Sequence, residues 1–168
     1  MSDVLGKGDA YYRTWVKRLA PVAFFLFPTD ISGLENLPEG PAIICANHSN
    51  NVDPVLIAAA LGPERHVHFM AKQELMGKPI LGKFLDNLGS FGVERGSSSD
   101  IAAIRNVMKC IKSGDKVMIF PEGTRVAEDG LVDPKTGAVR LAAKLKVPIV
   151  PVFISRKKKP FCRARLVM

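Results

Sequence analysis

The stretch Ile43-Ile44-Cys45-Ala46-Asn47-His48-Ser49-Asn50-Asn51-Val52-Asp53-Pro54 passes from an apolar run through a polar turn to an Asp-Pro pair. The apolar run 43–46 is typical of a buried strand. Asp53 as N-cap and Pro54 as first helical residue predict the start of an apolar helix that continues to Leu61. The stretch therefore predicts a strand–turn–helix unit, with its polar residues at the end of the strand.

His48 and Asp53 are the candidate reactive pair of this unit. Five residues apart on one helix, they would lie roughly 140° apart, so they can meet only if the chain turns between them. Asn50 and Asn51 favour such a turn. An Asp carboxylate on one ring nitrogen would fix the histidine tautomer and leave the other nitrogen as a base. The alternative is that Asp53 only caps a helix and His48 is an ordinary loop residue.

The composition indicates one globular domain. The chain has 168 residues, 47% of them hydrophobic, which excludes a disordered chain and a multi-span membrane protein. A formal net charge of +8 favours anionic partners such as nucleic acid, phosphorylated substrates or an anionic lipid surface. The three cysteines are scattered, and no secretion signal is seen, which indicates reduced thiols in a cytosolic compartment.

Apolar runs and helical patterns alternate along the rest of the chain. They predict an α/β fold, a single layered domain over 29–168 with a mostly parallel or mixed sheet flanked by helices. Strands are expected at 29–33, 43–46, 66–70, 91–93, 116–120, 147–154 and 161–168, and helices at 55–61, 80–87, 101–112 and 137–146. Pro148 and Pro151 predict that the strand 147–154 is an irregular or edge strand.

Residues 1–28 are expected to form a separate amphipathic segment. Apolar residues recur at helical spacing and basic residues lie off that stripe, in the order Tyr12, Arg13, Trp15, Val16, Lys17, Arg18 and Leu19. Pro21 is expected to end the helix. The apolar run 19–27 is shorter than the roughly 20 residues of a spanning helix, and no signal-peptide cleavage site follows it. The helix either packs on the protein's own core or lies in a membrane interface.

No metal or nucleotide site is predicted. His66 and His68 share one strand face, but no third ligand is evident from the sequence. The glycine-containing region 92–99 matches neither the P-loop nor the dinucleotide-binding spacing. Lys72, at the end of the strand that contains both histidines, is a candidate for contact with a phosphate.

Four blocks together resemble the glycerolipid acyltransferases, whose signature is His, four residues, Asp. They are Asn47-His48 with Asp53-Pro54, then Gly89-Ser90-Phe91-Gly92-Val93-Glu94-Arg95, Phe120-Pro121-Glu122-Gly123-Thr124-Arg125 and Val147-Pro148-Ile149-Val150-Pro151-Val152. Their order and spacing cover most of the chain. The third block is most similar to the 1-acylglycerol-3-phosphate branch. One departure is Asn50, which stands where that family commonly has Ser.

The resemblance implies transfer of a fatty acyl group from an acyl thioester to the free hydroxyl of 1-acylglycerol 3-phosphate, giving phosphatidic acid in phospholipid biosynthesis. It makes His48 the base and Asp53 its orienter. It assigns the acceptor's phosphate and glycerol to Arg95, Glu122, Gly123, Thr124, Arg125 and Lys72. No Gly-x-Ser-x-Gly serine is present, so we expect direct attack without an acyl-enzyme. No cofactor or metal is expected, and the co-substrate is acyl-CoA or acyl-acyl carrier protein.

Two alternatives remain open at this point: a related acyltransferase with another lysophospholipid or glycerol 3-phosphate as acceptor, and a non-catalytic lipid- or phosphate-binding protein. Nucleic-acid binding is not expected, because no basic motif with interleaved aromatic residues is seen. The expected location is the cytoplasmic face of the cell membrane, as a peripheral or monotopic protein. The strand 161–168 ends on Leu-Val-Met without a turn residue, so we expect the natural chain to continue past Met168.

Overall fold

The computed structural model describes residues 8–93, 101–126, 132–156 and 164–168. The strands are β1 (Thr29–Ser32), β2 (Ala42–Ala46), β3 (Val67–Lys72), β4 (Phe91–Val93), β5 (Lys116–Ile119), β6 (Ile149–Arg156) and β7 (Ala164–Val167). The helices are α1 (Gly8–Leu26), α2 (Asp53–Leu61), α3 (Gln73–Met76), α4 (Pro79–Asn87), α5 (Ile101–Lys112) and α6 (Gly137–Leu145), with a short 3-10 helix η1 (Leu34–Asn36).

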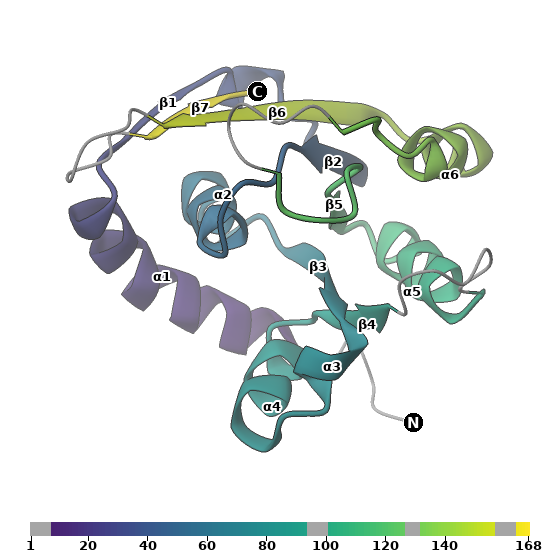
Figure 1. Ribbon diagram of the computed structural model, residues 1–168, viewed down its shortest axis with the longest axis horizontal. Coiled ribbons are helices and arrows are strands. Elements are labelled where there is room, and N and C mark those ends of the chain that lie inside the picture. Colours follow the sequence, from purple (N-terminus) through teal and green to yellow (C-terminus); the bar gives the residue numbers. More distant parts are fainter. Residues whose placement is uncertain (1–7, 94–100, 127–131, 157–163) are drawn as a thin grey trace.

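The strands form one sheet in the order β1-β7-β6-β2-β5-β3-β4, with helices on both sides of it (Figure 1). Neighbouring strands run parallel, except for β6 and β7, which are antiparallel. The prediction of an α/β fold with a mostly parallel sheet flanked by helices is therefore confirmed.

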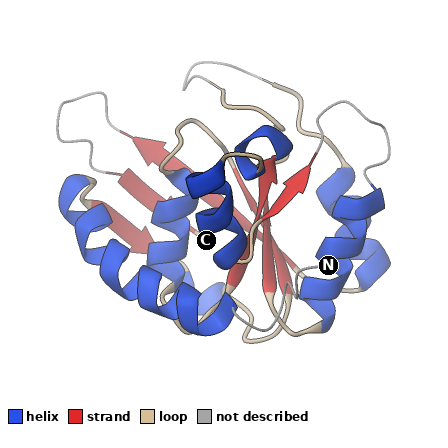
Figure 2. Cartoon of the chain, turned by 90° about the horizontal axis from the view of Figure 1, so that it is seen from below, coloured by secondary structure: helices blue, strands red, loops and turns tan. Residues whose placement is uncertain are grey.

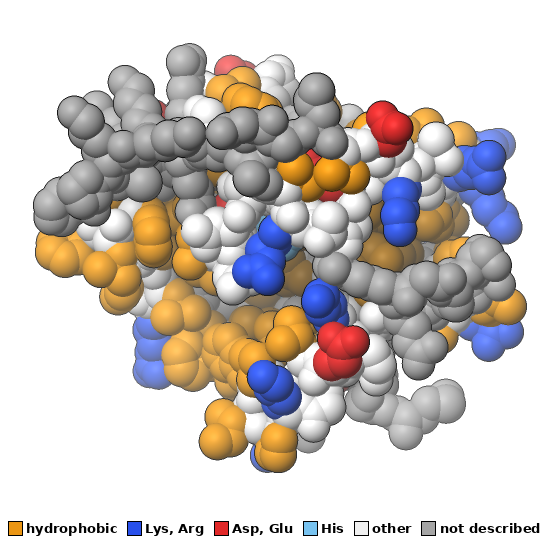
Figure 3. Space-filling view, in the orientation of Figure 1, with side chains coloured by type: hydrophobic (Ala, Val, Ile, Leu, Met, Phe, Trp, Pro, Cys, Tyr) orange, Lys and Arg blue, Asp and Glu red, His pale blue; other side chains and the backbone are white. Residues whose placement is uncertain are grey.

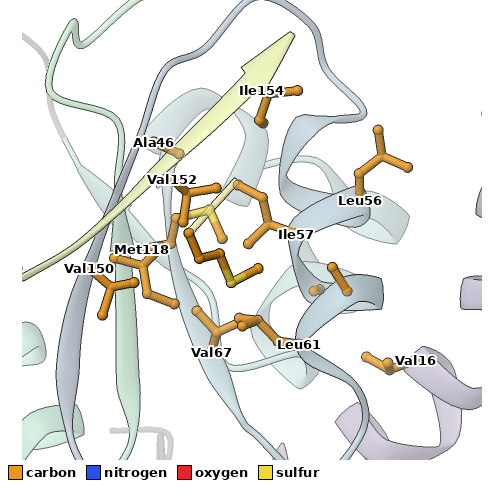
Figure 4. Packing of buried hydrophobic residues seen from close by; sticks show 14 of the residues in the cluster. Val16, Ala46, Leu56, Ile57, Leu61, Val67, Met118, Val150, Val152 and Ile154 are labelled. Carbon is orange, nitrogen blue, oxygen red and sulfur yellow. The ribbon is translucent and has the colours of Figure 1, made fainter. Parts of the chain in front are cut away.

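The central strands β2 and β5 are buried on both faces. Ile44 and Met118 point into a cluster with α1 and α2, and Figure 4 shows Met118 packed beside Ile57 and Leu61 of α2. Ile43 and Val117 point the other way, into a second cluster with α5 and α6. Strands buried on both faces have continuous apolar sequences, which is why 43–46 shows no alternation.

Helix α1 continues through Pro21, so the predicted end of the helix at this residue is wrong. Tyr12, Val16 and Ala23 are buried against α2, on both sides of the proline along the helix. A proline inside a helix costs about 3 kcal/mol through a lost hydrogen bond and a steric clash. Packing of the apolar stripe before and after Pro21 offsets this cost and keeps the helix continuous.

Strand β6 lies between β7 and β2, so the predicted edge position is also wrong. The carbonyl of Pro148 and the N–H of Ile154 both face β2. Because successive residues of a strand face opposite sides, the nitrogen of Pro151 faces away from β2. β7 pairs with β6 only from Phe153 onward. No described strand lies opposite the nitrogen of Pro151, so the N–H that proline lacks would have no strand to bond.

Candidate functional site

Residues from the first and third blocks, together with Lys72, lie at one edge of the sheet. β2, β3, β4 and β5 are parallel, and Figure 2 shows the central strands running toward the same edge. His48 follows β2, Lys72 ends β3, and Glu122 follows β5. Parallel α/β sheets build binding sites at this carboxyl edge, which makes it the candidate site.

His48 and Asp53 are in contact, as the sequence predicted. His48 Nδ1 lies 3.1 Å from Asp53 Oδ2. The chain turns between them, with Asp53 N donating to Asn50 O at 3.2 Å. One detail differs: α2 begins at Asp53, and Val52 occupies the N-cap position. Asp53 is fully buried, and its Oδ2 also accepts from the backbone N–H groups of Ser49 (2.8 Å) and Asn50 (2.7 Å).

These contacts determine the tautomer of His48. A carboxylate only accepts hydrogen bonds, so Nδ1 carries the proton and Nε2 retains a lone pair. Among the described residues no hydrogen bond to Nε2 is found, and 15% of the side chain is exposed. The ring stacks on Phe120, with centroids 4.1 Å apart and an angle of 22° between the planes. The contacts therefore leave Nε2 as the ring nitrogen of His48 that could accept a proton from a ligand.

The third block forms the turn after β5. Glu122 Oε2 accepts from the backbone N–H of His48 at 2.9 Å. Gly123 has φ +66°, a left-handed conformation that glycine adopts without strain. Thr124 and Arg125 are exposed. The turn thus touches the base through Glu122 and presents Arg125 to solvent.

Among the predicted cations, Lys72 is partly buried at the end of β3, and Arg95 lies outside the described residues. Sequence reasoning missed Lys135, whose Nζ would lie 3.4 Å from a Cβ placed on Gly123. Lys135 N donates to Pro121 O at 2.9 Å, which brings the loop 132–136 to this turn. Lysine and arginine side chains gather near the middle of the face in Figure 3.

An apolar pocket of about 180 Å³ lies between α1 and α2. Its lining has no charged side chain and includes Leu19, Val22, Ala23, Leu26, Phe27, Val52, Val55 and Leu56. Val52 directly precedes Asp53 in the chain, so the pocket lies beside the start of α2. Val22, Phe25 and Leu26 on α1 are 52%, 83% and 56% exposed, which continues the apolar surface outward from the pocket.

His66, which directly precedes β3, and His68 lie at the opposite edge. The structure adds the third candidate ligand that the sequence did not show. His66, His68 and Asp115 offer ligand atoms within 4.8 Å of one another. However, His68 Nδ1 faces Gly89 O (2.8 Å) and Nε2 faces Asp115 Oδ2 (3.0 Å). Because both oxygens are acceptors, both ring nitrogens of His68 carry protons and neither has a lone pair for a metal.

His66 is held in the same way, with Nδ1 on Asp9 Oδ1 (2.6 Å) and Nε2 on Leu88 O (3.2 Å). Burial alone lowers the pKa of His68. Its hydrogen bond to Asp115, the adjacent Cys110 sulfur and the Gly89 carbonyl raise it by more, to about 10. The geometry favours a fixed imidazolium at His68 over a metal centre.

Comparison with known proteins identifies a family that the chain resembles. The sequence model of the Acyltransferase family matches residues 29–155. A 1-acyl-sn-glycerol-3-phosphate acyltransferase of Bacillus subtilis is 38% identical over 118 residues, which are 70% of this chain and 57% of that protein. The enzyme of the same name from Salmonella typhimurium is 37% identical over 120 residues, 69% of this chain and 47% of that protein.

A solved structure shares the fold. The 1-acyl-sn-glycerophosphate acyltransferase PlsC from Thermotoga maritima aligns with a TM-score of 0.69 at 24% identity, over 92% of this chain and 66% of that one. The chain spans about half the length of the curated relatives it matches.

Proposed function

The chain belongs to the acyltransferase family, and on that premise we propose that it transfers an acyl group from an acyl thioester to the free hydroxyl of 1-acylglycerol 3-phosphate. The contact between His48 Nδ1 and Asp53 Oδ2 is the observation that carries this proposal, because it leaves Nε2 free to accept a proton. The two relatives described above bear names with this activity, which supports the choice of acceptor.

In the proposed reaction, His48 Nε2 takes the proton of the acceptor hydroxyl as its oxygen attacks the thioester carbonyl carbon. A carbon–oxygen bond forms and gives a tetrahedral oxyanion. Collapse of this intermediate breaks the carbon–sulfur bond, and the thiolate leaves with the proton that His48 had accepted. Asp53 stabilises the imidazolium formed between the two proton transfers. The product is phosphatidic acid, a step of phospholipid biosynthesis, and the donor is acyl-CoA or acyl-acyl carrier protein.

The acceptor phosphate requires fixed positive charge near His48. Arg125 and Lys72 are proposed for this role, together with Arg95, and Gly123 and Thr124 would line the acceptor at the same turn. Arginine suits this role because its planar fork binds two phosphate oxygens at once. Lys135 adds a cation beside Gly123. The acyl chain would lie in the apolar pocket between α1 and α2, where no charged group opposes its burial.

We further propose peripheral binding to an anionic membrane surface on the cytoplasmic side. The described residues contain no helix that is both long and apolar enough to cross a membrane. The ring of Trp15 packs on Phe84, with centroids 5.2 Å apart. The exposed apolar side chains Val22, Phe25 and Leu26 support contact through the carboxyl-terminal end of α1.

Phe25→Ser tests the membrane contact without removing the buried part of α1. We expect weaker co-sedimentation with vesicles that contain phosphatidylserine, and an unchanged circular dichroism spectrum. Equal binding of the variant and the parent protein would contradict this contact.

The activity itself is tested with purified protein and a panel of acyl-CoA and acyl-acyl carrier protein donors against lysophosphatidate, other lysophospholipids and glycerol 3-phosphate. We expect product only with an acyl thioester, and most product with lysophosphatidate. His48→Ala is the control for a contaminating enzyme. If the protein binds lysophosphatidate but forms no product with any of the acyl donors, a non-catalytic lipid-binding protein would be favoured.

A further inference from the structure

The backbone of His48 is held through both of its polar groups by a turn far away in the sequence. Glu122 Oε2 accepts from His48 N at 2.9 Å, across 74 residues of sequence. Four residues later in the same turn, Val126 N donates to His48 O at 2.8 Å. The peptide groups on both sides of the His48 Cα are therefore tied to the segment after β5.

The preceding residue is tied to the other neighbour of β2. Asn47 Nδ2 donates to Ile154 O at 2.9 Å, and Asn47 Oδ1 accepts from Ile154 N at 2.7 Å. The side-chain amide thus takes the place of the next backbone pair in the β2–β6 ladder, after the last register pair Ala46 and Val152. The chain can turn away from the sheet after β2 while it stays hydrogen-bonded to β6 through the Asn47 side chain.

These two attachments explain how a base on a turn can be held rigidly. The contacts with Asp53 and Phe120 restrain the ring of His48, but they do not determine where its Cα lies. A displacement of about 1 Å of a catalytic group can cost roughly 10²-fold in rate. The backbone of His48 must therefore be restrained as well, and Glu122 does this by accepting from His48 N through Oε2.

We propose that Glu122 is a positioning residue, whose carboxylate holds the His48 peptide in place for proton transfer and does not bind the acceptor phosphate. This proposal rests on the proposed function and reassigns a residue that the family resemblance placed in the acceptor site. No ion pair to Glu122 is found among the described residues, so its negative charge would repel an acceptor phosphate. A hydrogen bond between an N–H group and an ionised carboxylate is stronger than one between neutral groups.

The test compares Glu122→Ala with Glu122→Gln, which retains an acceptor oxygen. The positioning role predicts that Glu122→Ala lowers kcat by roughly 10- to 100-fold, with a nearly unchanged KM for lysophosphatidate. Glu122→Gln should recover most of kcat. Glu35→Ala, the same change at an exposed position on η1, is the matched control and should behave like the parent protein. A raised KM with normal kcat in both Glu122 variants would overturn the proposal.

A second measurement does not depend on turnover. The chain contains three histidines, so histidine-labelled protein gives three backbone amide signals, and the signal of His48 is the one missing from His48→Ala. Glu122→Ala should shift the His48 amide upfield and leave the amides of His66 and His68 in place. If no donor and acceptor react, the proposed function fails, and the amide signal still decides this proposal. An unchanged His48 amide in Glu122→Ala would overturn it.

Discussion

His48 and His68 lie at opposite edges of the same parallel sheet, and their rings are held for different purposes. At the carboxyl edge, Asp53 contacts one nitrogen of His48, and no described residue bonds the other. At the amino edge, His68 has an acceptor oxygen on each nitrogen and a fully buried side chain. Both ring nitrogens of His68 are therefore occupied, whereas no described residue occupies Nε2 of His48.

The same contrast holds for the lysines at the two edges. Lys116, at the start of β5, is 3% exposed and donates to the carbonyl oxygens of Glu39 and Gly40 at 3.2 and 2.8 Å. Burial, and then the nearby Arg65, lower the pKa of Lys116. Lys72 and Lys135 at the carboxyl edge make no such bonds to described residues. We infer that the amino edge stabilises the fold and that the carboxyl edge holds the cations that are available to a ligand.

The largest effect that this comparison predicts is on catalysis, in His48→Ala. We expect kcat to fall by about 10²–10⁴-fold, the usual contribution of a general base. The free energy of unfolding should fall less than this loss of activity suggests, because the buried Asp53 carboxylate still accepts from the backbone N–H groups of Ser49 and Asn50. Steady-state assays and urea denaturation measure the two quantities. Retention of more than a tenth of kcat would rule out His48 as the base.

His68→Ala should produce the opposite result. Removal of the ring leaves Asp115 without its partner and creates a cavity at the amino edge. Breaking a buried ion pair costs about 3–5 kcal/mol, and Asp115, 24% exposed, suggests the lower end of that range. Urea denaturation should show this loss, while kcat per folded molecule stays near that of the parent protein. An unchanged unfolding midpoint would contradict a stabilising role of His68.

Deprotonation of His68 by pH should have a smaller effect than its removal, because the ring and its packing remain. The folded pKa of about 10 lies above the unfolded value of 6.5. The contribution of His68 is therefore fully present below pH 6.5 and is lost as pH rises toward 10. Histidine NMR should show His68 still protonated at pH 8, and unfolding experiments should show stability falling over this interval. Asp115→Asn is the control that should flatten this dependence.

The smallest effect is expected from Arg125→Lys, which preserves charge and removes the planar fork. Loss of one hydrogen bond worth about 1 kcal/mol predicts a roughly fivefold higher KM for lysophosphatidate. The KM for the acyl donor should change less, and stability should not change. Arg105→Lys, on the exposed side of α5, serves as a matched control. Equal changes in both KM values would mean that Arg125 does not select the acceptor.

Local patterns were sufficient where a single element carried the information. The helix predicted at 101–112 is found with the same bounds, and Gly114, with φ +91°, follows it as the expected stop. The contact between His48 and Asp53 was also predictable, because the asparagines between them require a turn. Local patterns were misleading at Pro21 and Pro151, where packing of α1 on α2 and the short extent of β7 decided the outcome.

The sequence by itself therefore determined the alternation of strands and helices, the order of the four blocks and the contact between His48 and Asp53, because each depends on local patterns. Only the tertiary structure decided that Glu122 bonds the backbone of His48, that Lys135 lies beside Gly123 and that Asp115 meets His68. These contacts join residues that are 12 to 74 positions apart in the chain. Such pairs leave no periodic or spacing signal, since the pairing of parallel strands alone sets which chain ends meet at each edge of the sheet.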